Sequence, residues 1–264
     1  MTDQDSRIQQ AAERLRNAEA TATACDPVRD LLGTADDLRV AYAVQRANRA
    51  HFINSGRRLI GRKIGTSSPG ALKMFGITAP TYAMLYHDMV LNDGDTIPAG
   101  RLIQPRLEAE VAVVLERGLD MPNPTLVDAI RAVGYVVPAI EVVDSRIRNN
   151  DFKIVDLVAD NVSGAFFVLG SVARKLEGLD LRRATGTLTS NGNVIGQGPG
   201  AAVWGNPINA LAWLAAKQVK IGLPLREGDV VMTGTYCPMQ PANPGDAVSV
   251  DIDGLGRCEV NFAA

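Results

Sequence analysis

The sequence has little of what secreted, membrane-spanning and nucleic-acid-binding proteins need. Its three cysteines are odd in number and far apart, so they indicate neither a disulfide framework nor a zinc pattern. No apolar run is long enough to cross a bilayer, and the polar first residues lack the apolar core of a secretory signal. The formal net charge of -2 excludes a global attraction to nucleic acid or to anionic membranes. We therefore expect a cytoplasmic protein.

The residues that are present suit an ordinary folded protein, with 46% hydrophobic and 21% charged residues in a chain of 264. A weak apolar stripe predicts a helix over residues 5–25, and a clearer one follows, with Thr34 as a possible cap and Ser55-Gly56 as its end. We expect residues 1–57 to form a helical arm or subdomain. Residues 58–264 are expected to form a β-rich domain that carries the functional site.

Short strands separated by Gly and Pro dominate from about residue 59 onward. Residues 108–116 alternate well, and Asn191-Gly192 between two apolar runs predicts a hairpin with a type I′ turn. Asn206 and Pro207 are typical of a helix start. Because strands and helices do not alternate regularly, we expect an α+β protein with a mixed, mainly antiparallel β body.

Three glutamates form the most suggestive polar group. Glu108 and Glu110 are two residues apart on a predicted strand, so both project to one face. Glu141 lies inside an apolar run, where an unpaired charge would be very costly. An all-oxygen set without nearby His or Cys favours Mg²⁺ or Mn²⁺ over zinc. The alternative is that Glu108 and Glu110 are the solvent face of an edge strand, and the residues alone leave both interpretations open.

Other polar residues stand out in apolar or Gly-rich runs. Lys63 could neighbour an anionic substrate or transfer a proton, and Asp88, next to His87, could act as an acid or base. Residues 160–164 could offer hydroxyl and backbone donors, and the amides of Thr233-Gly234-Thr235 could bind an anionic oxygen. A surface lysine, a turn aspartate and two ordinary loops are the plain alternatives. No nucleophile elbow, P-loop or dinucleotide-binding motif is present.

The order and spacing of these segments resemble the 2-keto-4-pentenoate hydratase and 4-oxalocrotonate decarboxylase family, within the fumarylacetoacetate hydrolase superfamily. The resemblance runs from about residue 38 to residue 262. The segments that carry it are Gly61-Arg-Lys-Ile-Gly65-Thr66-Ser67, Leu85-Tyr-His-Asp-Met89, Arg106-Leu-Glu-Ala-Glu-Val111, Ala139-Ile-Glu-Val-Val-Asp-Ser-Arg146, Asp160-Asn-Val-Ser-Gly-Ala-Phe-Phe-Val-Leu-Gly170, Trp204-Gly-Asn-Pro207 and Gly228-Asp-Val-Val-Met-Thr-Gly-Thr235.

The resemblance implies the β-roll body of that superfamily, an oligomer, and Mg²⁺ or Mn²⁺ on Glu108, Glu110 and Glu141. It also implies that Lys63, Asp88 and Ser163 line the substrate pocket and carry the catalytic roles. The implied partners are a small 2-keto or 2-hydroxy dienoic acid, further copies of the chain, and a related enzyme of the same pathway.

The expected activity is hydration of 2-hydroxypenta-2,4-dienoate to 4-hydroxy-2-oxopentanoate, in the meta-cleavage catabolism of aromatic compounds. Decarboxylation of 4-oxalocrotonate is the alternative, and it would need a cation for a distal carboxylate. Candidates for that cation are Arg62, Arg106 and Arg146. Hydrolytic C–C cleavage ranks lower, because His51 is not followed by an acidic residue one helical turn later. An inactive accessory subunit is the remaining alternative.

Overall fold

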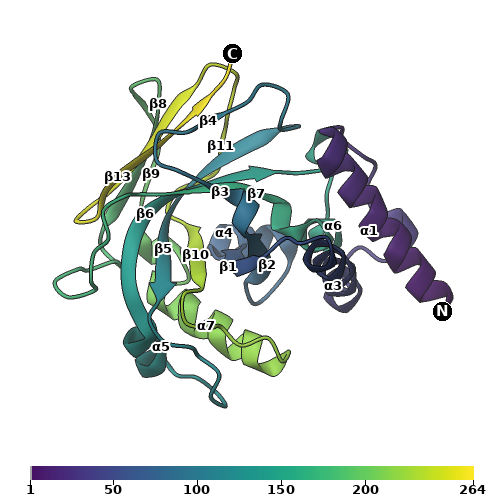
Figure 1. Ribbon diagram of the computed structural model, residues 1–264, viewed down its shortest axis with the longest axis horizontal. Helices are drawn as coiled ribbons and strands as arrows, with labels where there is room; N and C mark the ends of the chain where they lie inside the picture. Colours follow the sequence, from purple (N-terminus) through teal and green to yellow (C-terminus); the bar gives the residue numbers. More distant parts are fainter. Residues whose placement is uncertain (1) are drawn as a thin grey trace.

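Two β-sheets form the body of the protein, with helices on one side and at one end (Figure 1). The computed structural model describes residues 2–264. The larger, eight-stranded sheet runs in the order β2-β1-β10-β5-β6-β7-β3, with β11 paired to β5. Its strands are β1 (Leu59–Gly65), β2 (Thr81–Tyr86), β3 (Val90–Leu91), β5 (Pro105–Leu115), β6 (Val133–Asp144), β7 (Gly164–Leu169), β10 (Val230–Thr235) and β11 (Gln240–Pro241).

The smaller, five-stranded sheet runs in the order β4-β13-β12-β8-β9. Its strands are β4 (Thr96–Ile97), β8 (Thr185–Ser190), β9 (Asn193–Pro199), β12 (Ala247–Ile252) and β13 (Gly256–Phe262). Among the strands of residues 2–264, only three pairs are parallel, namely β1 with β10, β3 with β7 and β4 with β13. The predicted α+β class with a mixed, mainly antiparallel body is therefore confirmed.

The helices surround the larger sheet at the end away from the smaller one (Figure 1). They are α1 (Asp3–Thr21), α2 (Arg29–Leu32), α3 (Leu38–Asn54), α4 (Pro69–Phe75), α5 (Leu126–Ala132), α6 (Ile154–Ala159) and α7 (Pro207–Lys220). Four short 3₁₀ turns complete the part of the chain that the structure describes: η1 (His87–Met89), η2 (Arg148–Asn150), η3 (Asn161–Ser163) and η4 (Gly200–Ala202). Within residues 2–264, no helix combines the length and the apolar character that a membrane crossing requires.

Local sequence signals account for most element boundaries. The hairpin of β8 and β9 turns at Asn191 and Gly192, whose φ angles of 50° and 79° suit the predicted type I′ turn. Asn206 caps α7 by accepting a hydrogen bond from Ile208 N. The predicted cap of α3 was wrong by three residues. Asp37, whose carboxylate accepts the amide of Arg39, begins that helix, and Thr34 instead accepts the amide of Asp37 in the preceding turn.

The N-terminal helices share a hydrophobic core with later parts of the chain. Leu15 and Val44 pack in one buried cluster with Ile147 and residues of α6. An ion pair also joins the N-terminal helices to α6: Arg29 Nη1 lies 2.7 Å from Oδ2 of the fully buried Asp156. The helical segment is thus anchored to the β-rich body, and the division into residues 1–57 and 58–264 stays a prediction.

Candidate metal centre and active site

Three glutamates meet on one face of the larger sheet, on the adjacent strands β5 and β6. Glu108 lies directly opposite Glu141 in the antiparallel register, and Glu110 follows two residues later on the same face of β5. One carboxylate oxygen from each residue lies within 4.8 Å of the others. Strand alternation therefore explains why Glu108 and Glu110 share one face of β5. The pairing register of β5 with β6 places Glu141 beside them.

Burial makes this cluster electrostatically costly when it holds no cation. Glu110 and Glu141 are 0% and 1% exposed, while Glu108 is partly exposed. Burial and the charge of Glu141 raise the pKa of Glu108 to about 7. Burial and the two neighbouring carboxylates raise the pKa of Glu110 well above its usual range, and burial raises that of Glu141. The metal-free cluster therefore retains protons that a cation would displace.

The unsatisfied oxygens of the cluster fit a bound divalent cation. Among the described residues, no hydrogen bond reaches the buried Oε1 of Glu110 or the buried Oε2 of Glu141. Buried carboxylate oxygens normally have partners, so these two are available as ligands. Hard carboxylate oxygens suit Mg²⁺, Mn²⁺ or Ca²⁺, and three protein ligands leave coordination positions for water or substrate.

Lys63 supplies a permanent positive charge beside the glutamates. Its ammonium group pairs with Glu141 and donates a hydrogen bond to Val162 O at 3.0 Å, and the side chain is 1% exposed. Burial would lower the pKa of Lys63, but the carboxylates of Glu141 and Glu108 outweigh that effect and raise it. Lys63 therefore remains an ammonium in the metal-free protein and partly compensates the charge of the cluster.

An unusual backbone segment holds the acceptor of Lys63 in place. Asn161, Val162 and Ser163 have φ angles of 51°, 48° and 54°, in the left-handed region that branched residues such as valine rarely adopt. The Asn161 side chain fixes the segment by bonding both the amide and the carbonyl of Met84, each at 2.9 Å. Such a conformation persists only where surrounding contacts impose it, and it is common at functional sites.

Gly234 provides the backbone donor to Glu110. Its amide donates a hydrogen bond to Oε2 of that glutamate at 2.9 Å. The residue has a φ of +116°, and a Cβ there would lie 2.3 Å from Ser67 Oγ, so only glycine fits. The amides of Thr233-Gly234-Thr235 were expected to bind an anionic oxygen. In the structure, the Gly234 amide binds a carboxylate oxygen of the protein's own Glu110.

A cavity of about 810 Å³ opens above the cluster. Lys63, Glu108 and Ser163 line it, so the structure brings these predicted site residues together. The remaining polar lining includes hydroxyl groups and two further cations: Thr66, Ser67, Ser68, Ser145, Thr235, Arg106 and Lys153. The apolar lining is concentrated on α4 and the chain around α6: Met74, Phe75, Phe152 and Leu157. Such a cavity is suited to a small acid with an apolar carbon chain.

Asp88 does not join this cavity, in contrast to the expectation from the sequence. It lies in the exposed turn η1, where its Oδ2 is 2.8 Å from Nε of Arg57. His87 beside it is also exposed, and its Nδ1 accepts the amide of Arg58. Both side chains stabilise the junction between α3 and the sheet, and neither lines the cavity with Lys63.

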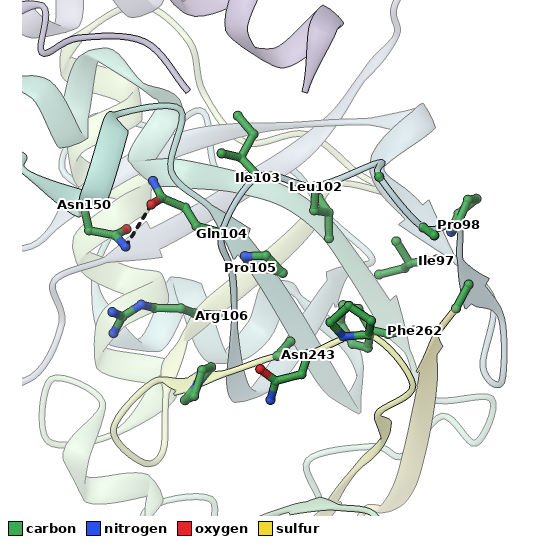
Figure 2. Close-up of a pocket in the computed structure, with 16 residues that line it drawn as sticks. Ile97, Pro98, Leu102, Ile103, Gln104, Pro105, Arg106, Asn150, Asn243 and Phe262 are labelled. Atoms are coloured by element: carbon green, nitrogen blue, oxygen red, sulfur yellow. Dashed lines mark hydrogen bonds between the residues drawn. The ribbon is translucent and has the colours of Figure 1, made fainter. Parts of the chain in front are cut away.

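Of the three arginines considered for a distal carboxylate, the structure brings only Arg106 to the cavity. Arg62 points to the opposite face of β1, and Arg146 is buried in an ion pair with Asp160. Arg106 lines the cavity together with Gln104 and Asn150, and Asn150 donates to Gln104 Oε1 at 3.2 Å (Figure 2). These three residues also border a neighbouring surface pocket of about 410 Å³.

Sequence reasoning did not identify several cavity residues. Thr66 and Ser67 directly follow the Lys63 strand and belong to the quoted motif Gly61 to Ser67, so their place in that motif was an available signal. Met74 and Phe75 gave no such signal, since a short helix with no buried residue has an ordinary sequence. Their contribution depends on the position of α4 over the sheet.

The family comparison agrees with this arrangement. The family described as fumarylacetoacetate (FAA) hydrolase C-terminal matches residues 42–263. The chain belongs to this family. Among characterised members, 2-keto-4-pentenoate hydratase of Burkholderia vietnamiensis is 45% identical over 258 residues, covering 98% of each chain. 2-Keto-4-pentenoate hydratase 1 of Dechloromonas aromatica is 44% identical and covers 96% of each chain.

A solved structure of the same family matches nearly the whole fold. The 4-oxalocrotonate decarboxylase from Pseudomonas putida G7, complexed with magnesium and adipate, has a TM-score of 0.94 and 33% identity. The match covers 99% of this chain and 98% of the decarboxylase. A second structure of that enzyme, with calcium and acetate, has a TM-score of 0.92. In both structures this decarboxylase is complexed with a divalent cation and a carboxylic acid.

Proposed function

We propose that this chain is a divalent-metal-dependent hydro-lyase that adds water to 2-hydroxypenta-2,4-dienoate and forms 4-hydroxy-2-oxopentanoate. This reaction belongs to the meta-cleavage breakdown of aromatic compounds. The observation that carries the proposal is the cluster of Glu108, Glu110 and Glu141 with Lys63, of which Glu108 and Lys63 line the cavity. The identity of 45% to a named 2-keto-4-pentenoate hydratase over nearly the full chain supports the choice of substrate.

Glu108, Glu110 and Glu141 would hold the cation, and Mg²⁺ or Mn²⁺ is our choice for this all-oxygen site. When bound, the cation supplies Lewis acidity toward the carboxylate and the C2 oxygen of the substrate. The Gly234 amide keeps the Glu110 carboxylate oriented toward the cluster. The cavity lining also offers several hydroxyl groups, and Ser163 is the one we assign to orienting the substrate carboxylate.

The hydration requires two proton transfers and one addition of water. The 2-hydroxyl group loses a proton and C5 gains one, which converts the dienol to an enone. Water then adds at C4, and C3 takes up a proton. Lys63 is our candidate for moving the proton in the first step, because its ammonium group lies at the cavity floor beside the cluster. Asp88 has no part in this proposal, since its carboxylate pairs with Arg57 outside the cavity.

A comparison of two substrates tests the reaction type. With Mg²⁺, the purified chain should consume 2-hydroxypenta-2,4-dienoate, with loss of its conjugated absorbance and formation of the hydroxy-keto acid. It should release no CO₂ from 2-oxohex-3-enedioate offered in parallel. Release of CO₂ from the diacid without hydration of the dienoate would assign the chain to the decarboxylases instead.

Decarboxylation of 4-oxalocrotonate remains the second candidate function because cations are present at the mouth of the cavity. Arg106 and Lys153 line it, and among residues 2–264 neither forms an ion pair. A distal carboxylate could pair with either. The solved decarboxylase, 33% identical to this chain, was complexed with a dicarboxylic acid, adipate. The higher identity to the hydratases places this function second.

The affinity for Mg²⁺ should depend on pH. The pKa of Glu108 is raised to about 7 and that of Glu110 is raised further, so protons occupy the cluster at low pH and compete with the cation. Affinity should therefore increase as pH rises from 6 through 7 to 8, by up to about tenfold per pH unit for each displaced proton. Calorimetric titrations with Mg²⁺ in buffers of different ionisation enthalpy measure both the affinity and the released protons. A dissociation constant that stays constant over this range would argue against binding at these glutamates.

Other parts of the proposal follow from the family and the composition. The chain acts as a homo-oligomer in the cytoplasm, where its three free cysteines Cys25, Cys237 and Cys258 stay reduced. A complex with a related pathway enzyme is the further partner in this proposal, and co-purification of the two proteins tests it. Hydrolytic C–C cleavage has no support at the cavity, because His51 is exposed on α3 and does not line it. An inactive accessory role is disfavoured by the retained cluster of buried charges.

A further inference from the structure

Arg146 holds both ends of η3, the left-handed segment that carries Ser163. Its Nη2 donates a hydrogen bond to Asp160 O at 2.6 Å, just before the segment, and its Nη1 donates to Gly164 O at 3.1 Å, just after it. The same Nη1 donates to Asp144 O at 2.8 Å, at the end of β6. Arg146 is buried, with an exposed fraction of 4%. One guanidinium group therefore fastens η3 to the larger sheet.

The carboxylate of Asp160 completes this connection. Its Oδ2 accepts the backbone amide of Arg146 at 3.0 Å, and its Oδ1 accepts Nε of the same residue. The backbone carbonyl of Asp160 also accepts the Ser163 amide at 2.8 Å. The Ser163 hydroxyl lies 3.4 Å from Asp160 Oδ2, which is a long hydrogen bond that a substrate carboxylate can replace. Asp160 thus contacts both the arginine that holds η3 and the serine that η3 presents.

The backbone of η3 depends on such contacts. Its three residues all have left-handed φ angles, and a branched residue such as Val162 avoids this conformation unless its surroundings impose it. The Asn161 side chain holds the start of the segment through the backbone of Met84, and Arg146 holds the residues on either side. The place of Ser163 is therefore set by side chains other than its own.

The arginine and the aspartate act on the cavity wall from outside the cavity. Val162 and Ser163 line the cavity together with Lys63, whose ammonium group donates to Val162 O. Arg146 and Asp160 do not line it. They border instead a separate cavity of about 20 Å³ beneath α1 and α3. An effect of this pair on catalysis must therefore pass through the segment that it holds.

We propose that Arg146 and Asp160 are positioning residues for the hydration, because they hold the Ser163 hydroxyl where it meets the substrate carboxylate. The inference rests on the proposed function and on the role of Ser163 in it. Catalytic and orienting groups tolerate little displacement, and a misplacement of about 1 Å can lower a rate by about 100-fold. The arginine of the Asp144-Ser-Arg146 motif thus serves the site without contacting the substrate.

Arg146→Lys in the full-length protein tests this role. A lysine keeps the positive charge beside Asp160 but lacks the planar fork that spans the two carbonyls around η3. The variant should lower kcat/KM for 2-hydroxypenta-2,4-dienoate by about tenfold to 100-fold. Its affinity for Mg²⁺, measured by calorimetry, should stay nearly unchanged, because the three glutamates are in place. Arg148→Lys is the matched control and should keep full turnover, since Arg148 is exposed and pairs with Asp26 at the surface.

A double-mutant cycle with Ser163→Ala separates positioning from a general structural role. If Arg146 acts through Ser163, Arg146→Lys should lower kcat/KM much less in the Ser163→Ala background than in the unaltered protein. Equal losses in both backgrounds would overturn the proposal, and so would full turnover in either single variant. Failure of the proposed function would show separately, as absence of hydration by the unaltered protein, and would overturn this role with it.

A second variant keeps the proposal testable if Arg146→Lys does not fold. Asp160→Asn keeps the shape of the side chain but replaces one of its two acceptors by a donor, so it cannot accept both the amide and Nε of Arg146. It should lower kcat/KM in the unaltered background and have a much smaller effect beside Ser163→Ala. Unchanged turnover of Asp160→Asn, or equal losses in the two backgrounds, would contradict the proposed role.

Discussion

Glu110→Gln should abolish hydratase activity and leave the protein folded. Glu110 is fully buried, the Gly234 amide already satisfies its Oε2, and its Oε1 is one of the oxygens free to bind a cation. A glutamine offers a weaker, neutral ligand and exposes an amide group to the cluster. Loss of the Lewis acid, which contributes several kcal/mol of transition-state stabilisation, should lower kcat/KM by on the order of 10³-fold or more.

The stability of the same variant provides an independent measurement. Because the raised pKa of Glu110 keeps this carboxyl group protonated in the metal-free protein, a neutral amide of the same shape should leave the unfolding temperature of the metal-free variant nearly unchanged. The rise in unfolding temperature with Mg²⁺ should disappear. Glu116→Gln is the matched control, since Glu116 is exposed and pairs with Lys175 just beyond β5. Unchanged turnover in Glu110→Gln would contradict the ligand assignment.

Lys63→Met should have the second large effect, on both activity and stability. The substitution leaves the buried Glu141 carboxylate without its only ion-pair partner among residues 2–264. Breaking a buried pair in this way costs about 3–5 kcal/mol in free energy of unfolding. Activity should be lost because no other ammonium group of the described chain reaches the floor of the cavity beside Glu141.

Mg²⁺ separates the two effects of Lys63→Met. A bound cation compensates the charge of Glu141, so the variant should recover part of its stability on addition of Mg²⁺ while its activity stays lost. Denaturant unfolding with and without Mg²⁺, together with the dienoate assay, measures both quantities. Lys153→Met is the matched control, because that exposed lysine lines the same cavity near its mouth. Full activity of Lys63→Met with Mg²⁺ would remove Lys63 from the mechanism.

Local signals in the sequence predicted the elements well and part of the site. Strand alternation placed Glu108 and Glu110 on one face, and the Asn191-Gly192 turn was recognisable from two residues. The position of Glu141 opposite Glu108 could not be derived from the residues alone, because register depends on how two strands far apart in the sequence pair. The apolar neighbours of Glu141 indicated that it needs a partner, and the family resemblance implied that it shares a metal ion with the other two glutamates.

Asp88 shows why one expected residue failed to reach the site. Its neighbours along the chain suggested an acid–base group, but its partner Arg57 lies 31 residues earlier, at the end of the helical segment. An ion pair between such distant residues leaves no local pattern. The left-handed Val162 is a similar case, since nothing in its sequence context distinguishes it from a valine in a strand.

The most direct test of the account is the position of a bound metal ion. Crystals of the full chain grown with Mn²⁺ can be measured at a wavelength where manganese scatters anomalously. We predict one strong anomalous peak per chain, within coordination distance of carboxylate oxygens of Glu108, Glu110 and Glu141. A fully occupied manganese site elsewhere in the cavity, with none at these three glutamates, would contradict the central claim.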